Sequence, residues 1–308
     1  MQTTSNLFSE QQQTAVALGF FDGIHRGHRK VLSLASKQEQ CGLLPVCLTF
    51  AESPKAVIHP EKPFSYLMTR ADKLHALASL GIKRTVFADF RSLMEMSAEL
   101  FFYDVLVIRL RAKELFCGFN YRFGKGAKGN ITLLQRLCDE NNVGLTIVPP
   151  EKMEDDVICS TLIKQLIGEG NVERANKMLD ARFGFSAEII HGKRLGHTLG
   201  TPTINQPPAK GLVSPRFGVY ASVVTLENGT QYCGVTNVGV KPTVGSDAPL
   251  WETWMPDYHG GELYGQNADV RLLRFIRPEQ RFASLNDLRA EILRNAAAAK
   301  AVYVMHHS

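Results

Sequence analysis

The sequence predicts an α/β protein in which a doubly wound parallel sheet is followed by a small antiparallel β-barrel and a closing helix. In the first half, short apolar runs alternate with amphipathic helical patterns, which is typical of a parallel sheet covered by helices on both faces. In the second half, strand-like runs follow one another with turn residues between them, which is typical of a barrel. At 308 residues, the chain is long enough for two hydrophobic cores.

The first half contains strands and helices in alternation. The expected strands are the apolar runs 14–20, 44–50, 85–88, 113–117 and 144–148. The expected helices are the amphipathic segments 27–40, 70–80, 98–109 and 131–141. Gly81 follows the second of these helices, where a C-cap glycine is expected. The order of these elements predicts the parallel sheet.

The pattern changes after two further helical segments, 161–168 and 172–179. The expected strands beyond them are 187–190, 219–226, 231–238 and 269–275, and the closing helix is 286–300. Asn228-Gly229 lies between two of these strands and is a strong signal for a β-hairpin. We therefore expect two domains, residues 1–183 and 184–308.

Composition excludes several classes of protein. The net charge of +5 is compatible with anionic substrates but is too weak and dispersed for nucleic-acid binding. None of the six cysteines forms a C-x-x-C pair, so we expect free thiols in a reducing compartment rather than a zinc site. Residues 1–13 lack the pattern of a signal peptide, and no apolar run approaches the about 20 residues of a membrane helix. The expected location is cytoplasmic, without a membrane partner.

The run 19–28 lies where the first strand meets a helix, and ligands bind at that edge of a parallel sheet. Gly23 and Gly27 allow a phosphate to approach the backbone. His25 and His28 have a spacing that places both side chains on one side of a first helical turn, beside the helix N-terminus. This combination predicts a phosphate site that stabilises charge during attack at phosphorus. Two surface histidines on a loop, or a metal site without an evident third ligand, are the alternatives.

Two further segments could contact phosphates. The first is a glycine-rich segment around Lys125, with Gly124, Gly126 and Gly129. It predicts either a mobile basic loop over a nucleotide or a solvated turn. Ser160 and Thr161 precede a helix, where their hydroxyls could cap the helix or bind a phosphate, with Lys164 one turn further on.

The second half contains two polar features of its own. Thr203 and Asn205 alternate, so on an extended strand their side chains share a face. A hydroxyl and an amide oxygen suit a Mg²⁺ ion that keeps waters and phosphate oxygens as its other ligands. The alternative is a turn followed by an edge strand. Glu252, in the run 251–254, is either paired structurally or placed as a general base.

Taken in order, these motifs resemble the bifunctional riboflavin kinase/FAD synthetase family of bacteria, and the resemblance covers nearly all of the chain. The first half resembles the FMN adenylyltransferase module, a Rossmann-like nucleotidyltransferase of the H-x-G-H type, and the second half resembles the riboflavin kinase barrel. The matching segments are Gly19–His28, Gly118–Gly124, Ser160-Thr161, Pro202–Asn205, Gly234–Thr243, Glu252 and Leu263–Gly265.

The resemblance implies two reactions, namely phosphorylation of riboflavin by ATP to FMN and adenylylation of FMN to FAD with release of pyrophosphate. It implies that Glu252 takes the proton of the ribityl hydroxyl, that Thr203 and Asn205 hold Mg²⁺ with ATP, and that His25 and His28 stabilise the adenylyl transfer. The implied nucleotide and phosphate contacts are Gly19, Phe21, Asp22, Gly23, Gly27, Asn120, Ser160, Thr161, Lys164, Gly200 and Pro202. The sequence leaves the oligomeric state open.

Several positions depart from the family pattern. Phe20 stands where the family usually has asparagine, Ser53 where it has histidine, and Lys164 where it has arginine. His197 and Thr201 are changes in the kinase half. Because more polar positions have changed in the first half, a riboflavin kinase with a weak or repurposed N-terminal module is one alternative. A non-catalytic flavin-binding regulator is the other, although a binder has no need for a base at Glu252.

Overall fold

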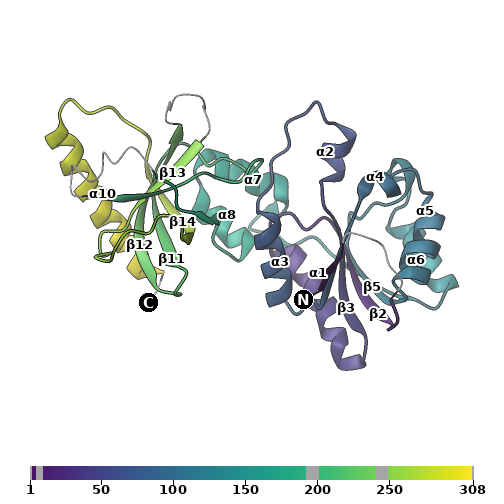
Figure 1. Cartoon of the computed structure of the whole chain (residues 1–308). Coiled ribbons are helices and arrows are strands. Elements are labelled where there is room, and N and C mark those ends of the chain that lie inside the picture. Colours follow the sequence, from purple (N-terminus) through teal and green to yellow (C-terminus); the bar gives the residue numbers. More distant parts are fainter. Residues whose placement is uncertain (1, 5–9, 192–200, 241–248, 307–308) are drawn as a thin grey trace. The chain divides into compact units, whose positions relative to one another are not determined.

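The computed structural model describes residues 2–4, 10–191, 201–240 and 249–306. The chain forms two compact units, of which the first comprises residues 1–64 and 70–159 and the second comprises residues 65–69 and 160–308 (Figure 1). Segment 65–69 belongs to the second unit because the Tyr66 N–H donates to the Gly211 carbonyl at 2.7 Å and the Tyr66 carbonyl accepts from the Val213 N–H at 2.8 Å. The functional boundary between residues 183 and 184 stays a prediction.

The first unit contains a six-stranded sheet in the order β1-β4-β3-β2-β5-β6, and every neighbouring pair is parallel (Figure 1). The strands are β1 (Gln2–Thr4), β2 (Thr14–Leu18), β3 (Leu44–Phe50), β4 (Arg84–Ala88), β5 (Ala112–Gly118) and β6 (Gly144–Val148). From β2, the chain first builds the sheet toward β3 and β4 and later continues on the other side with β5 and β6. The strand order therefore reverses between β2 and β5, which is where ligands bind in open α/β sheets.

Helices cover both faces of this sheet, as Figure 1 shows for α1 and α3 on one side and α5 and α6 on the other. The helical segments of the first unit are α1 (Arg26–Lys37), η1 (Gln38–Cys41), α2 (Pro54–Ile58), α3 (Arg70–Ser79), α4 (Phe90–Leu93), α5 (Ala98–Leu100), η2 (Phe101–Arg109), η3 (Lys125–Ala127) and α6 (Ile131–Glu140). A short hairpin, β7 (Lys152–Met153) and β8 (Asp156–Val157), follows the sheet. The doubly wound parallel sheet that the sequence predicts is confirmed.

One predicted helix has a different geometry. The segment 98–109 begins as α5 and continues as η2, a π-helix. The Leu110 N–H donates to the Val105 carbonyl at 3.0 Å, and Arg109 Nε contacts Asp104 Oδ2 at 2.9 Å, so both contacts follow the wide spacing of a π turn. The wide turns still bury Phe102 and Leu106 against the sheet.

The second unit contains a curled antiparallel sheet of six strands in the order β10-β13-β12-β11-β14-β9. The strands are β9 (Gly184–Glu188), β10 (Thr203–Gln206), β11 (Gly218–Leu226), β12 (Gln231–Val240), β13 (Pro249–Trp254) and β14 (Asn267–Arg277), and the helices are α7 (Ser160–Glu169), α8 (Val172–Leu179) and α10 (Leu285–Met305). The two edges of the sheet meet where Ile190 bridges Asn205. Helix α10 packs its Ala299 and Val302 against the outer face of the sheet. These contacts confirm the predicted small barrel and its closing helix.

Gln206 reinforces the closure of this barrel from inside. Its side chain is buried, and Nε2 donates to the carbonyls of Ala187 on β9 at 2.6 Å and Ala268 on β14 at 2.7 Å. We expect Gln206→Leu to lower the free energy of unfolding of the second unit by about 2 kcal/mol, because two buried acceptors lose their donor. Both tryptophans, Trp251 and Trp254, lie on β13, so denaturant unfolding followed by tryptophan fluorescence reports on this unit alone.

The matched control is Gln266→Leu, which changes an exposed glutamine of the same unit and should shift unfolding by less than about 0.5 kcal/mol. Equal unfolding curves for the two variants would contradict the closing role of Gln206.

Within the described residues, no helix has both the length and the apolar character that crossing a membrane requires.

Candidate functional sites

The loop between β2 and α1 lies at the point where the strand order reverses. It is tight, since Phe21, Gly23 and Ile24 have φ angles of 53°, 83° and 44°. Phe21 is buried, and its ring lies so close to Gly19 that a Cβ there would be 2.9 Å from the ring. Gly19 therefore allows the Phe21 ring to fold under the loop. Phe21 is thus a buried side chain that packs against the loop and is not exposed at its surface.

His25 and His28 are brought together at the end of this loop. His25 is the N-cap of α1, and its Nδ1 accepts a hydrogen bond from the His28 backbone N–H at 3.4 Å. The two imidazole rings stack with centroids 3.7 Å apart, and the Phe21 ring meets His28 edge-on at 5.2 Å. Because Nδ1 of His25 accepts, its proton lies on Nε2, which is available to donate.

The polar atoms of this pair are suited to a bound phosphate. Among the described residues, His28 Nδ1 is buried and has no hydrogen-bond partner. Burial lowers the pKa of His25 to about 4. Burial also lowers the pKa of His28 well below its ordinary value, and the neighbouring charges of His25 and Lys73 lower it further. Both imidazoles are therefore neutral near pH 7, and each can offer an N–H to a phosphate oxygen.

Lys73 on α3 lies beneath the same loop, although no sequence pattern predicts a role for it. It is 6% exposed, and its Nζ donates to the Phe20 carbonyl at 2.8 Å while lying 4.2 Å from the centroid of the Phe20 ring. Thr49 Oγ1 donates to the same carbonyl at 2.9 Å. A lysine in an amphipathic helix is normally solvated, so only the packed structure reveals this contact. The backbone of the loop is thus held at Phe20 although the family's asparagine is absent.

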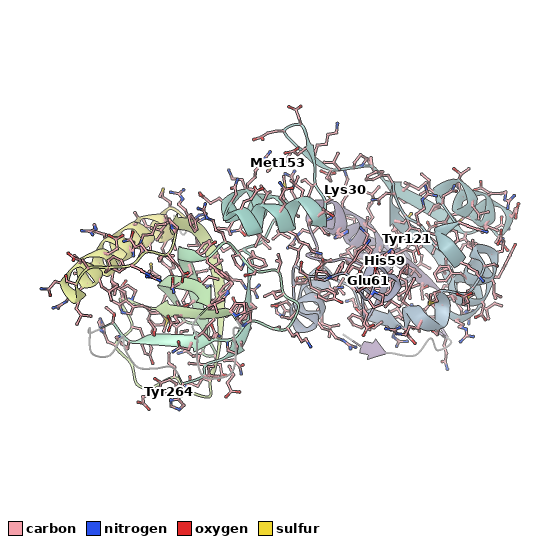
Figure 2. All side chains as sticks on the ribbon, turned by 90° about the horizontal axis from the view of Figure 1, so that it is seen from above. Lys30, His59, Glu61, Tyr121, Met153 and Tyr264 are labelled. Atoms are coloured by element: carbon pink, nitrogen blue, oxygen red, sulfur yellow. The ribbon has the colours of Figure 1, made fainter. Side chains whose placement is uncertain are left out.

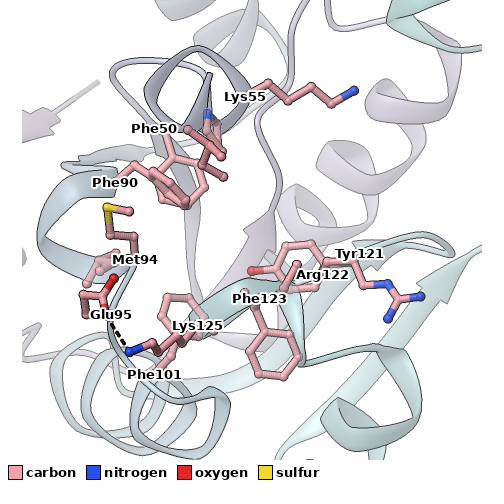
Figure 3. A pocket seen from close by; sticks show the side chains of 16 residues that line it. Phe50, Lys55, Phe90, Met94, Glu95, Phe101, Tyr121, Arg122, Phe123 and Lys125 are labelled. Atoms are coloured by element: carbon pink, nitrogen blue, oxygen red, sulfur yellow. Dashed lines mark ion pairs between the residues drawn. The ribbon is translucent and has the colours of Figure 1, made fainter. Parts of the chain in front are cut away.

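A cavity of about 740 Å³ lies at the carboxyl ends of β3 and β5 (Figure 3). Its lining is mainly aromatic and aliphatic and comes from Phe50, Pro54, Lys55, Ile58, Phe90, Leu93, Met94, Glu95, Phe101 and residues 121–127. Lys125 lies on its rim and pairs with Glu95, with Nζ and Oε2 2.6 Å apart. The predicted glycine-rich basic loop therefore borders a cavity.

Other predicted residues of the first unit lie close to these features. Asp22 is 4% exposed, and a Cβ at Gly27 would lie 3.4 Å from Cε1 of His25. Asn120 is exposed in the turn after β5. Ser53, at the position where the family has histidine, is buried at the start of α2. Helix α1 is further tied to the segment after β6, because Lys30 (labelled in Figure 2) pairs with Glu151 at 2.7 Å.

Ser160, Thr161 and Lys164 lie on the first turns of α7, in the second unit. Their predicted contacts with a phosphate stay predictions. Thr161 is exposed, so its hydroxyl is available to a ligand.

Three polar side chains form a row across the second unit. Glu252 on β13 lies directly opposite Asn205 on β10 and directly opposite Asn237 on β12. Directly opposite residues of antiparallel strands share a face, so the three side chains are neighbours. The adjacent residues Trp251 and Thr253 are buried on the other face, whereas Glu252 is partly exposed. From the sequence alone, Asn237 is only one residue of the matching segment Gly234–Thr243. The strand register places it beside Glu252.

The same row contains a buried acceptor without a donor. Asn205 is 3% exposed, and among the described residues its Oδ1 has no hydrogen-bond partner. Thr203 lies two positions before it on β10, on the same face. An unpaired amide oxygen beside a hydroxyl is the donor set that Mg²⁺ prefers, so the residues present fit this ion. Pro202 is exposed just before β10, and Gly200 lies outside the described residues.

Two further features flank this row. Gly239, two residues after Asn237 on β12, lies beside the carboxylate of the exposed Glu279 side chain. His191 and Tyr264 stack with ring centroids 3.8 Å apart, and Tyr264 lies at the outer edge of its unit (Figure 2). The motif containing Tyr264 therefore contributes to an aromatic pair at the edge of the second unit.

Two family models match the chain, namely FAD synthetase over residues 7–162 and riboflavin kinase over residues 179–303. The bifunctional riboflavin kinase/FMN adenylyltransferase of Escherichia coli strain K12 is 34% identical over 94% of this chain and 93% of its own length. The enzyme of the same name from Listeria monocytogenes is 32% identical over 94% of this chain and 92% of its own length.

A solved structure is also similar. The crystal structure described as a macrolide-efflux protein from Streptococcus pneumoniae is 29% identical, with a TM-score of 0.88 over 97% of this chain and 98% of that chain.

Proposed function

The chain belongs to the bifunctional riboflavin kinase/FMN adenylyltransferase family, and we propose that its second unit phosphorylates riboflavin while its first unit adenylylates FMN. It is an enzyme that uses ATP in both reactions, of which the first makes FMN and the second makes FAD and pyrophosphate. The observation that carries the assignment to the second unit is the row of Asn205, Glu252 and Asn237.

In the kinase reaction, Glu252 accepts the proton of the ribityl hydroxyl as that oxygen forms a bond to the γ-phosphorus of ATP, and the bond from that phosphorus to the β-phosphate oxygen breaks to release ADP. The Glu252 carboxylate lies opposite two amide side chains and remains partly open to a substrate, which supports this role. Thr203 and Asn205 hold Mg²⁺, which, when bound, neutralises charge on the ATP phosphates. Most of the remaining catalysis is positioning.

In the adenylyl transfer, an oxygen of the FMN phosphate forms a bond to the α-phosphorus of ATP, and the bond from that phosphorus to the pyrophosphate oxygen breaks. The neutral N–H groups of His25 and His28 stabilise the charge that develops on the α-phosphate. The stacked, buried pair at the start of α1 supports this role, because the helix N-terminus also favours an anion.

The aromatic cavity of the first unit binds the flavin ring of FMN in this proposal. Its volume of about 740 Å³ lies within the range of small-molecule sites. Phe50, Phe90 and Phe101 supply flat apolar walls for the ring, and Lys55 and Arg122 supply cations for the phosphate (Figure 3). The alternative of a weak or repurposed first unit predicts FMN formation without FAD.

One assay tests the proposal. Purified protein is incubated with riboflavin, ATP and Mg²⁺, and riboflavin, FMN and FAD are then separated by chromatography. We expect FMN to appear first and FAD to follow. FMN without FAD would favour the repurposed first unit, and the absence of both products would favour a flavin-binding regulator.

The Mg²⁺ site allows a sharper prediction. We expect Asn205→Ala to raise the Mg²⁺ concentration required for half-maximal FMN formation by about tenfold, because an oxygen ligand is lost. The measurement is the initial rate of FMN formation against Mg²⁺ at constant ATP. Asn286→Ala, an exposed asparagine at the start of α10, is the matched control. An unchanged Mg²⁺ dependence in Asn205→Ala would remove Asn205 from the metal site.

A further inference from the structure

Tyr121 extends into the aromatic cavity of the first unit. It follows β5, where its N–H donates to the Gly118 carbonyl at 3.0 Å, and its ring lies nearly parallel to that of Phe123 with centroids 5.8 Å apart and planes 15° apart. Figure 3 shows the hydroxyl oxygen pointing away from the backbone into the space that Phe90, Met94 and Phe101 border. The ring is thus fixed by packing, and the hydroxyl is its exposed end within the cavity.

The Tyr121 hydroxyl makes no hydrogen bond to any residue that the structure describes. Two other tyrosine hydroxyls do donate to an acceptor close by in the chain: Tyr220 donates to the Arg216 carbonyl at 2.5 Å, and Tyr258 donates to the Gly261 carbonyl at 2.8 Å. The hydroxyl is therefore open to a ligand atom in the cavity, and a contact with such an atom accounts for a tyrosine here rather than a phenylalanine.

The residues that line the cavity indicate which kind of ligand atom the Tyr121 hydroxyl would contact. Tyr121 is the hydroxyl-bearing side chain in the lining, while the charged Glu95 and Lys125 pair with each other on the rim. The isoalloxazine ring has a flat body with carbonyl oxygens and ring nitrogens along one edge. Aromatic walls hold the body but cannot satisfy those acceptors. Burial raises the pKa of Tyr121 above its ordinary value, so the phenol keeps its proton and can donate.

We propose that Tyr121 is a specificity-determining residue of the adenylyltransferase site, whose hydroxyl donates a hydrogen bond to the heteroatom edge of the flavin ring of FMN. The proposal rests on the assignment of this cavity to FMN. It names the group that distinguishes a flavin from an apolar ring of the same size.

The test is Tyr121→Phe, which removes the hydroxyl and keeps the ring. We expect the KM for FMN in FAD formation to rise about three- to tenfold, because one neutral hydrogen bond is lost. The kcat for FAD formation and the KM for ATP should stay within about twofold, since the hydroxyl contacts neither the α-phosphorus nor the adenine in this assignment. Riboflavin phosphorylation should be unchanged, which also shows that the protein is folded.

Tyr103→Phe is the matched control, because its hydroxyl lies at the surface and accepts from Asn141 Nδ2 at 3.5 Å. An unchanged KM for FMN in Tyr121→Phe, or an equal fall in kcat with both KM values constant, would overturn the proposal while leaving the adenylyltransferase assignment intact.

If the wild-type protein makes no FAD from FMN and ATP, the assignment of the first unit fails instead. Quenching of FMN fluorescence then decides the role of Tyr121 without turnover. Weaker FMN binding by Tyr121→Phe than by wild type supports the contact, and equal binding overturns it.

Discussion

Glu252→Gln should lower the rate of FMN formation roughly a thousandfold while FAD formation from supplied FMN continues at the wild-type rate. The amide keeps the shape of the side chain, its place opposite Asn205 and Asn237, and its capacity to accept a hydrogen bond. It cannot take the proton of the ribityl hydroxyl. The loss therefore measures proton transfer rather than packing.

Two separate assays on one preparation measure this result. The first supplies riboflavin and ATP and follows FMN, and the second supplies FMN and ATP and follows FAD. Glu227→Gln is the control, because Glu227 follows β11 in the hairpin turn and its Oε1 accepts from the Asn267 N–H, which a glutamine also does. If both activities of Glu252→Gln fell equally, the assignment of the two reactions to two sites would be wrong.

The sequence predicted best the bounds of strands that turn residues delimit on both sides. β3 and β6 have the predicted bounds, because each is a short apolar run between turn residues. The π geometry of η2 was not predictable, since an apolar period fits an α-helix as well and the wide spacing appears only in contacts such as Leu110 to Val105. The joining of segment 65–69 to the second unit includes a backbone pairing between Tyr66 and Leu212, which are far apart in the sequence.

In the candidate sites, too, local features were predictable from the sequence and long-range contacts were not. Local spacing predicted that His25 and His28 lie together, because a helical turn fixes their distance. It also placed Thr203 and Asn205 on one face, because a strand alternates. Local spacing could not predict that Asn237 and Lys73 lie at these sites. Their positions depend on strand register and on the packing of α3, which connect residues far apart in the chain. Tyr121 lies within the matching segment Gly118–Gly124, but only the structure shows that its hydroxyl extends into a cavity without a hydrogen-bond partner among the described residues.

Phe20 illustrates how a changed residue can leave a loop intact. Thr49 and Lys73 hold the loop at this position by donating hydrogen bonds to the Phe20 carbonyl. Any residue at this position supplies that carbonyl. The ring itself packs over the Lys73 ammonium and edge-on against Phe64. The loss of the family's asparagine therefore changes one side chain without removing the support of the histidine pair, which favours an active first unit.

His25→Asn should lower FAD formation roughly a hundred- to a thousandfold and leave riboflavin phosphorylation unchanged. His25 has one observed and one proposed role that this substitution separates, since its Nδ1 caps α1 and, in the proposed function, its Nε2–H stabilises the charge on the α-phosphate. Asparagine is among the best N-cap residues, so the helix start is preserved and the imidazole donor is lost. A fall in kcat with little change in the KM for FMN is the expected form of the loss.

The pH dependence of the wild-type enzyme checks the same role. Because burial holds the pKa of His25 to about 4, the pair stays neutral, and the kcat for FAD formation should show no titration of these imidazoles between about pH 8 and 5.5. His75→Asn, on the exposed side of α3, is the matched control and should change neither activity. Full FAD formation by His25→Asn would mean that the stacked pair shapes the loop and that the charge on the α-phosphate is stabilised elsewhere.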